Sequence, residues 1–279
     1  MSDAFLNPRG VFVRSILADP KDRAWRLLFI LAAGLAHLPF LLPTPLWLQA
    51  IATLVLAGLL PGALLVELLI GWGAPRLAAM ERAVLSIGAG YSSMVMLMLL
   101  LSYLPGGLSR SALLIAADLL LLTLAVVFIL TRRSAAPPVG HPAPEPQNPA
   151  AQRLPTTLII VSSILLVGGF LRLANLGYGE FQGDEARLAL RAAEVIQGYE
   201  NALFVHKKGP TEILLPTAIY VMSERLNEVA ARLPFALASL TGLVATFCLG
   251  RRLFGSLAGW AAAMLLAVDG YLIAFGRVV

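Results

Sequence analysis

Acidic and basic side chains stand close together in one stretch that lies between two long apolar runs. Asp184 and Glu185 open a segment with a helical pattern, and Arg187 follows two residues later. A carboxylate can take a proton from an incoming nucleophile, and arginine can hold a phosphate through charge-assisted hydrogen bonds. These residue types suit a group transfer in which a phosphate leaves. The simpler alternative is a capped surface helix whose acids favour its own dipole.

A second basic group follows in the same stretch. His206, Lys207 and Lys208 precede the turn formed by Gly209 and Pro210. A phosphate bound at the membrane surface would explain these cations, and surface pairing with Glu212 is the alternative.

The local pattern predicts two helices around these residues. The first has Asp184 as its N-cap and runs to Gly198, because an aspartate side chain accepts from the free amides of a first helical turn. The second covers about Thr211–Leu226. Both are expected to lie in the membrane interface.

The elements that must position these residues are membrane helices. The hydrophobic fraction is 58% and the charged fraction 13%, and the mean hydropathy is +0.81. This fraction of charged residues is too small to cover the surface of a water-soluble protein, and lipid must therefore cover much of the surface of this chain. The expected fold is an all-α polytopic membrane protein with about seven transmembrane helices, each near the roughly 20 residues needed to cross. The expected spans are Leu27–Leu42, Leu46–Ile70, Ala83–Leu104, Ser111–Leu130, Thr157–Leu173, Ala230–Leu249 and Leu257–Phe275.

Basic residues predict the orientation of these spans, because loops rich in lysine and arginine stay in the cytoplasm. The N-terminal arm and every second loop carry the arginines, which are Arg76, Arg82, Arg132, Arg133, Arg153, Arg251 and Arg252. The segment 175–228 is therefore predicted outside a plasma (inner) membrane that the chain crosses several times. This placement accounts for the net charge of +5 without nucleic acid. The first helix is expected to remain as an anchor, since no cleavage site follows it. The single cysteine, Cys248, excludes a disulfide framework within the chain.

The chain divides into three parts. Residues 1–133 form a four-helix membrane unit, 134–156 a proline-rich cytoplasmic linker, and 157–279 a second membrane part. Pro61 and Gly62 should kink the second helix. Glu67 and Asp118 are carboxylates within spans, and a structural role is expected for both, with Glu67 reaching Arg76 or the interface.

The order of motifs over residues 157–279 resembles the GT-C glycosyltransferases, with the protein O-mannosyltransferases and the lipid A aminoarabinose transferases as the nearest relatives. The resemblance rests on short motifs in a fixed order. They are Asp184-Glu185, Lys208-Gly209-Pro210, Ala231-Arg232-Leu233-Pro234 and the run Gly250–Gly255, followed by Phe275 and Arg277. The first four spans lie outside it.

The resemblance implies a sugar transfer from a polyprenyl-phosphate-linked donor to a lipid, glycan or protein acceptor at the outer face. It makes Asp184 the base on the acceptor, with Glu185 beside it, and Arg187 and Lys208 the cations that hold the lipid phosphate. Arg232 matches the family's Arg-Leu-Pro, and Arg232 and Lys207 are further candidates for binding this phosphate. His206 and Arg277 are other candidate site residues. Lys207 stands where the aminoarabinose enzymes have a carboxylate, which puts any metal or acceptor role of that acid in doubt. The second proline after their lysine is also absent.

Several questions stay open at this level. Members of the family continue through further spans, so the chain is expected to be the N-terminal part of a longer enzyme or a short relative. The alternative is a non-catalytic membrane module that binds lipid phosphate or scaffolds a partner. A transporter ranks last, because only one broken helix is evident. The sugar, the acceptor and any need for a divalent metal are not determined.

Overall fold

The computed structural model describes residues 20–70, 77–134, 154–199, 201–204 and 209–278, and these contain helices and turns but no strand. The helices of the first part are α2 (Pro20–Leu41), α3 (Leu46–Thr53), the π-helix η1 (Leu54–Leu59), α4 (Leu60–Ile70), α5 (Ala79–Ser102) and α6 (Arg110–Ser134). The helices of the second part are α7 (Leu154–Leu173), α8 (Gly183–Gln197), α9 (Thr211–Ser223), α10 (Glu228–Phe254), α11 (Ser256–Val268) and α12 (Gly270–Arg277).

The chain is a multi-pass membrane protein by the length and composition of its helices. Within the described residues, four helical segments are long and apolar enough to cross a bilayer, namely Leu46–Ile70, Ala79–Ser102, Arg110–Thr131 and Glu228–Phe254. The bent pair α11 and α12 makes a fifth if it counts as one span. The expected segments Leu27–Leu42 and Thr157–Leu173 are helical, but their apolar stretches are shorter. Seven spans are therefore not established.

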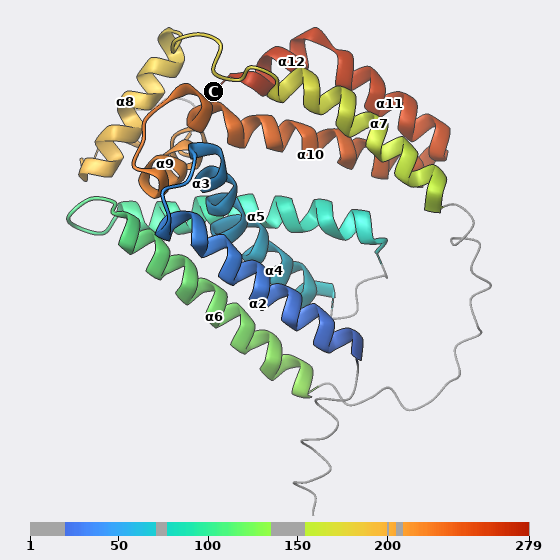
Figure 1. The fold of residues 1–279 in the computed structure, drawn as a ribbon, viewed down its shortest axis with the longest axis horizontal. Coiled ribbons are helices and arrows are strands. Elements are labelled where there is room, and N and C mark those ends of the chain that lie inside the picture. The colour runs from blue at the N-terminus through green and yellow to red at the C-terminus, as the bar shows by residue number, and fades with distance from the viewer. Residues whose placement is uncertain (1–19, 71–76, 135–153, 200, 205–208, 279) are drawn as a thin grey trace, which may run out of the picture.

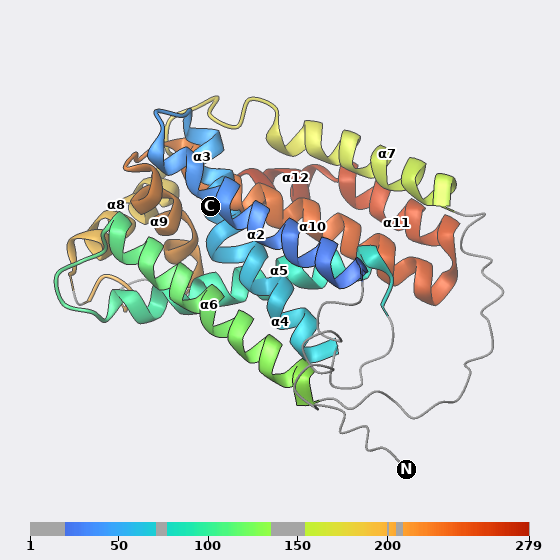
Figure 2. The same cartoon turned by 60° about the horizontal axis from the view of Figure 1, so that its bottom comes forward.

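Loops that the arginine pattern assigns to one side of the membrane gather at one end of the molecule. This loop end comprises residues 42–45, 103–109, 174–182, 198–199, 201–204 and 224–227, and it lies at the left with α8 in Figure 1. The Leu108 amide donates to the Ile196 carbonyl across 2.9 Å, and Arg110 lies 3.8 Å from Glu224. The turn before α5 and the turn between α10 and α11 lie toward the other end (Figures 1 and 2).

The two membrane parts share one hydrophobic core rather than standing apart. Buried residues of α3, η1, α4, α5 and α6 form a continuous cluster with those of α8, α9 and the start of α10. The Tyr91 hydroxyl in α5 donates to the Pro234 carbonyl in α10 across 2.8 Å. The loop end is therefore built by both parts, although 134–156 separates them in sequence.

Glycines let the helices of the first part approach closely. Gly58 and Gly62, four residues apart, face Ser86 and Gly90 of α5, and a Cβ added at Gly62 would lie 2.0 Å from the Ser86 carbonyl oxygen. Small residues at this spacing allow backbone contact between membrane helices. Pro61 lacks an amide hydrogen, and the six-residue π-helical stretch η1 directly precedes its segment. The expected irregularity at Pro61 is thus a local change of helix type.

Two predicted helices differ from the structure. Leu257–Phe275 is not one straight helix, because Asp269 ends α11 and caps α12 by accepting from the Leu272 amide, and the two helices bend by 64°. The second interfacial helix is α9, which is shorter than predicted and buried along Ile213–Ser223. It packs against α3, α5, α8 and α10, so protein and not lipid covers most of its surface.

Candidate functional site

The candidate site lies at the loop end, where α8 starts. Gln182 is the N-cap and Gly183 the first helical residue. The predicted cap at Asp184 is therefore wrong by two positions. The Gln182 amide instead donates to the Glu185 carboxylate across 3.2 Å, as in the second half of a capping box. Gly198 ends the helix in the left-handed conformation with φ 82°, which glycine adopts without steric cost.

Asp184 and Arg187 face outward from the first turn of α8. Their side chains are 76% and 83% exposed, and a carboxylate oxygen of Asp184 lies 3.7 Å from the Arg187 guanidinium. A surface pair at this distance contributes little to stability. Both groups are therefore available to a ligand at the membrane surface, with a negative and a positive charge side by side.

Glu185 points the opposite way and is buried against Arg232 of α10. The guanidinium Nε and Nη2 donate to the two carboxylate oxygens across 2.9 and 2.6 Å. The remaining Arg232 hydrogen atoms are donated to main-chain carbonyls of the loop before α8, at Leu176, Gly179 and Glu180. All five N–H groups of the guanidinium thus have protein acceptors.

A catalytic role for Glu185 and phosphate binding by Arg232 were expected, and the structure brings the two side chains together as a buried pair. The bidentate pair joins α8, α10 and the intervening loop, so it fixes the first turn of α8, which carries Asp184.

Arg277 of α12 also contacts the loop before α8. It donates to the carbonyls of Leu171, Ala174 and Asn175 at the C-terminal end of α7, where helices leave acceptors without partners. The Tyr178 ring lies under two cations, 5.1 Å from Arg277 and 5.8 Å from Arg232.

Arg172 was not predicted as a site residue, and it is fully buried. It donates to the Ser239 hydroxyl across 2.8 Å and to the Ala267 and Leu266 carbonyls across 2.9 and 3.1 Å. The carbonyls of Leu266 and Ala267 lie in the last turn of α11, just before the break at Asp269. An arginine at the end of an apolar run was the available signal, because a buried cation requires partners.

His206, Lys207 and Lys208 lie outside the described residues. Gly209, directly after them, has φ 107°, and Pro210 is the N-cap of α9. Within the described part of the chain, no group of three or more His, Cys, Asp or Glu side chains could hold a metal ion.

The two carboxylates predicted to have a structural role within spans of the first membrane part have basic partners. Glu67 pairs with Arg82, and the predicted partner Arg76 lies outside the described residues. Asp118 lies 3.2 Å from His37 of α2. These pairs fit the expected structural role, since charges within membrane helices are usually paired.

Comparisons with known proteins do not identify a family for this chain: no family model, no curated protein and no solved structure matches it.

Proposed function

We propose that this chain takes part in the transfer of a sugar from a polyprenyl-phosphate-linked donor to an acceptor at the outer face of the membrane. The observation that carries the proposal is the outward pair Asp184 and Arg187, 3.7 Å apart on the first turn of α8. The base acts on the acceptor oxygen and the cation on the leaving phosphate, and both of these groups are bonded to one sugar carbon during the transfer, so both residues must reach the same substrate.

The proposed step uses the two charges in separate roles. The Asp184 carboxylate takes the proton of the acceptor O–H group as the acceptor oxygen bonds to the anomeric carbon. The bond between that carbon and the phosphate oxygen breaks, and its electron pair stays on the phosphate. Arg187 then stabilises the released dianionic phosphate, together with Lys208 and Lys207 from the following segment.

The buried pair supports the step without touching substrate. Glu185 and Arg232 fix the first turn of α8 against α10, and Arg232 also holds the loop that enters this turn. A charged group that acts on a substrate needs such support, because small displacements lower the rate steeply.

A non-catalytic membrane module is the second candidate. It is favoured by Arg232, which has no N–H group left for a phosphate because all five are donated within the protein. In that case Asp184 and Arg187 form an ordinary surface pair, and the loop end serves only for docking.

Asp184→Asn separates the two candidates. Asparagine keeps the size of the side chain but cannot accept a proton, so the enzyme should lose about 100-fold or more in turnover. The measurement is release of polyprenyl phosphate from polyprenyl-phosphate sugars in membranes that contain the protein.

The matched control is Glu194→Gln, which removes another carboxylate of α8, one that pairs with Arg191. It should retain turnover near that of the parent, and the melting temperature of both variants should change little. Unchanged release by Asp184→Asn, with the parent active, would exclude the base role of Asp184, whereas a parent without any release would favour the non-catalytic module.

A further inference from the structure

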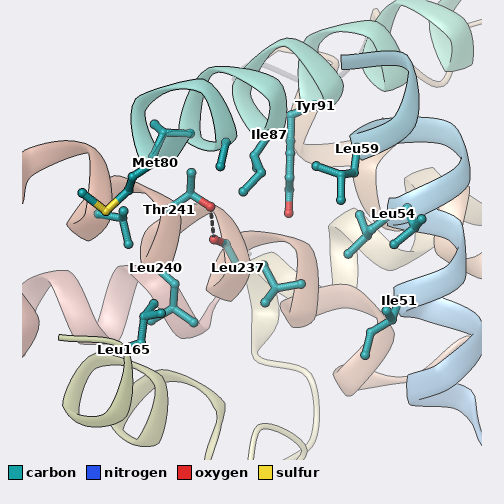
Figure 3. Close-up of a pocket in the computed structure, with 14 residues that line it drawn as sticks. Ile51, Leu54, Leu59, Met80, Ile87, Tyr91, Leu165, Leu237, Leu240 and Thr241 are labelled. Atoms are coloured by element: carbon teal, nitrogen blue, oxygen red, sulfur yellow. Dashed lines mark hydrogen bonds between the residues drawn. The ribbon is translucent and has the colours of Figure 1, made fainter. Parts of the chain in front are cut away.

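A groove with almost entirely apolar walls lies between the two membrane parts, away from the candidate site. Its volume is about 380 Å³, and Figure 3 shows side chains from four directions pointing into it. α3 and η1 contribute one wall, α5 a second, α10 a third, and Leu165 of α7 closes the fourth side. Neither part of the chain forms this groove alone.

The groove lies in the membrane-spanning region. On α5 its lining runs from Met80 in the first turn to Tyr91 at the middle of the helix, which is the half farther from α8. On α10 it runs from Leu237 to Val244, in the central part of Glu228–Phe254. α9 packs between α3, α5 and α10 at the loop end and contributes no lining residue.

The two hydroxyl groups of the lining already have acceptors. Tyr91 donates to the Pro234 carbonyl, and Thr241 donates to the Leu237 carbonyl across 2.8 Å. Neither hydroxyl hydrogen is left for a polar ligand or an ordered water molecule, which needs two to four polar partners. If the groove were vacant, the side chains that line it would also lack dispersion contacts on that side.

We propose that this groove binds the acyl chain of a bilayer phospholipid, which joins the two membrane parts. The surrounding bilayer supplies hydrocarbon chains at this depth, and the volume lies within the range of ligand pockets. The lining begins at the end of α5 opposite the loop end, so the chain enters from the leaflet on that side. The isoprenoid tail of a donor bound near Arg187 would enter from the other leaflet. This site is independent of the proposed transfer reaction.

Photocrosslinking tests the proposal on the full chain in nanodiscs of phosphatidylcholine that carries a diazirine on one acyl chain. The label on Ile87, Tyr91 and Leu237 should exceed the label on Leu122 at least fivefold. Leu122 is the control because it lies on α6 outside the groove and is 61% exposed, whereas the three groove residues are only partly exposed. Equal labelling of the two sets would overturn the proposal.

A matched pair of substitutions provides the second measurement. Ala83→Trp places a large side chain at the groove wall, whereas Ala258→Trp places it on the exposed surface of α11 outside the groove. The first should reduce groove labelling at least fivefold and the second should leave it unchanged. Groove labelling that survives Ala83→Trp would contradict acyl-chain binding there. Loss of label on adding polyprenyl phosphate, while Leu122 stays labelled, would overturn the assignment in favour of an isoprenoid chain.

Discussion

Two arginines near the loop end bind main-chain carbonyls of the segment that leads into α8. Arg277 reaches the carbonyls of Leu171 and Ala174 at the end of α7, and Arg232 reaches the loop itself. A planar guanidinium with five donors suits this task better than lysine, which offers a compact charge. Through these bonds, the carbonyls of a loop without regular secondary structure gain fixed donors, and the start of α8 gains a defined position.

Removal of the buried Arg232 should destabilise the protein strongly. Arg232→Met removes the cation that neutralises the buried Glu185 carboxylate and the donor to three main-chain carbonyls, which should cost about 3–5 kcal/mol. The measurement is thermal unfolding of the purified protein in detergent.

Arg191→Met is the matched control, because it breaks a partly exposed pair on the same helix and should cost less than about 1 kcal/mol. Equal effects of the two substitutions would mean that the buried pair contributes no more than a surface pair.

The exposed Arg187 should affect ligand binding rather than stability. Its loss in Arg187→Gln removes one charge-assisted contact of about 1.5–3 kcal/mol, so the affinity for polyprenyl phosphate should fall about tenfold or more. Lys208→Ala should act in the same direction, and because Lys207 can substitute for it, the variant that lacks both lysines should fall further. Binding is measured in detergent at fixed ionic strength with polyprenyl phosphate itself. Parental affinity in all three variants would rule out phosphate binding by these cations.

At this scale the sequence predicted local features better than distant ones. Asp184 and Arg187 are three residues apart, so helical spacing alone indicates that they share a face. Glu185 and Arg232 are 47 positions apart, and no local pattern reveals that they neutralise each other. Their burial follows from tertiary packing, in which α9 lies against both α8 and α10.

Helix contacts in the first membrane part depend on backbone approach at glycine. Gly62 of α4 lies so close to α5 that a methyl group there would overlap the Ser86 carbonyl and the Gly90 amide. Neither obstacle is a flexible side chain that can move aside. Gly62→Ala should therefore separate α4 from α5 and destabilise the protein by about 1–3 kcal/mol.

Gly34 provides a matched control for this prediction. It also lies within a membrane helix, but a Cβ there meets nothing within 4 Å. Gly34→Ala should be neutral or stabilising by about 0.5–1 kcal/mol, because alanine loses less backbone entropy in a helix. Both variants are compared by thermal unfolding in the same detergent. A smaller loss for Gly62→Ala than for Gly34→Ala would show that α4 and α5 do not touch in this way.

Helix positions were largely predictable because long apolar runs have few alternatives to helix. Two departures have a physical cause. Thr211–Leu226 was predicted at a membrane surface because it is short and has charged flanks, yet α9 is enclosed by helices from both parts of the chain. Asp269 splits the last predicted span, since its side chain caps the next helix and so competes with continuation of α11. Burial by distant segments and side-chain capping are not visible in hydropathy.

The arrangement of the whole molecule makes the alternation of arginine-rich loops testable. The loops predicted to lie outside share one end of the molecule with α8, and the Leu108 amide donates to the Ile196 carbonyl there. The accessibility of any one of these loops therefore indicates the side of the membrane on which all of them lie. A cysteine at Asn201 should react with an impermeant maleimide added outside intact cells, in a Cys248→Ala background. A cysteine at Ser256, in the turn between α10 and α11, should react only after the membrane is permeabilised, and so should one at His141 in the linker.

Ser109→Cys supplies an independent check from the first membrane part. Ser109 lies just after the contact between Leu108 and α8, so it must share the accessibility of Asn201 if the two parts form one body. Because positively charged loops remain in the cytoplasm, both positions are expected outside. Reaction of position 256 or 141 from outside, with 201 protected, would invert the orientation and place Asp184 in the cytoplasm, which contradicts transfer at the outer face. Opposite accessibility of 109 and 201 would instead separate the two membrane parts and remove both the shared core and the groove between them.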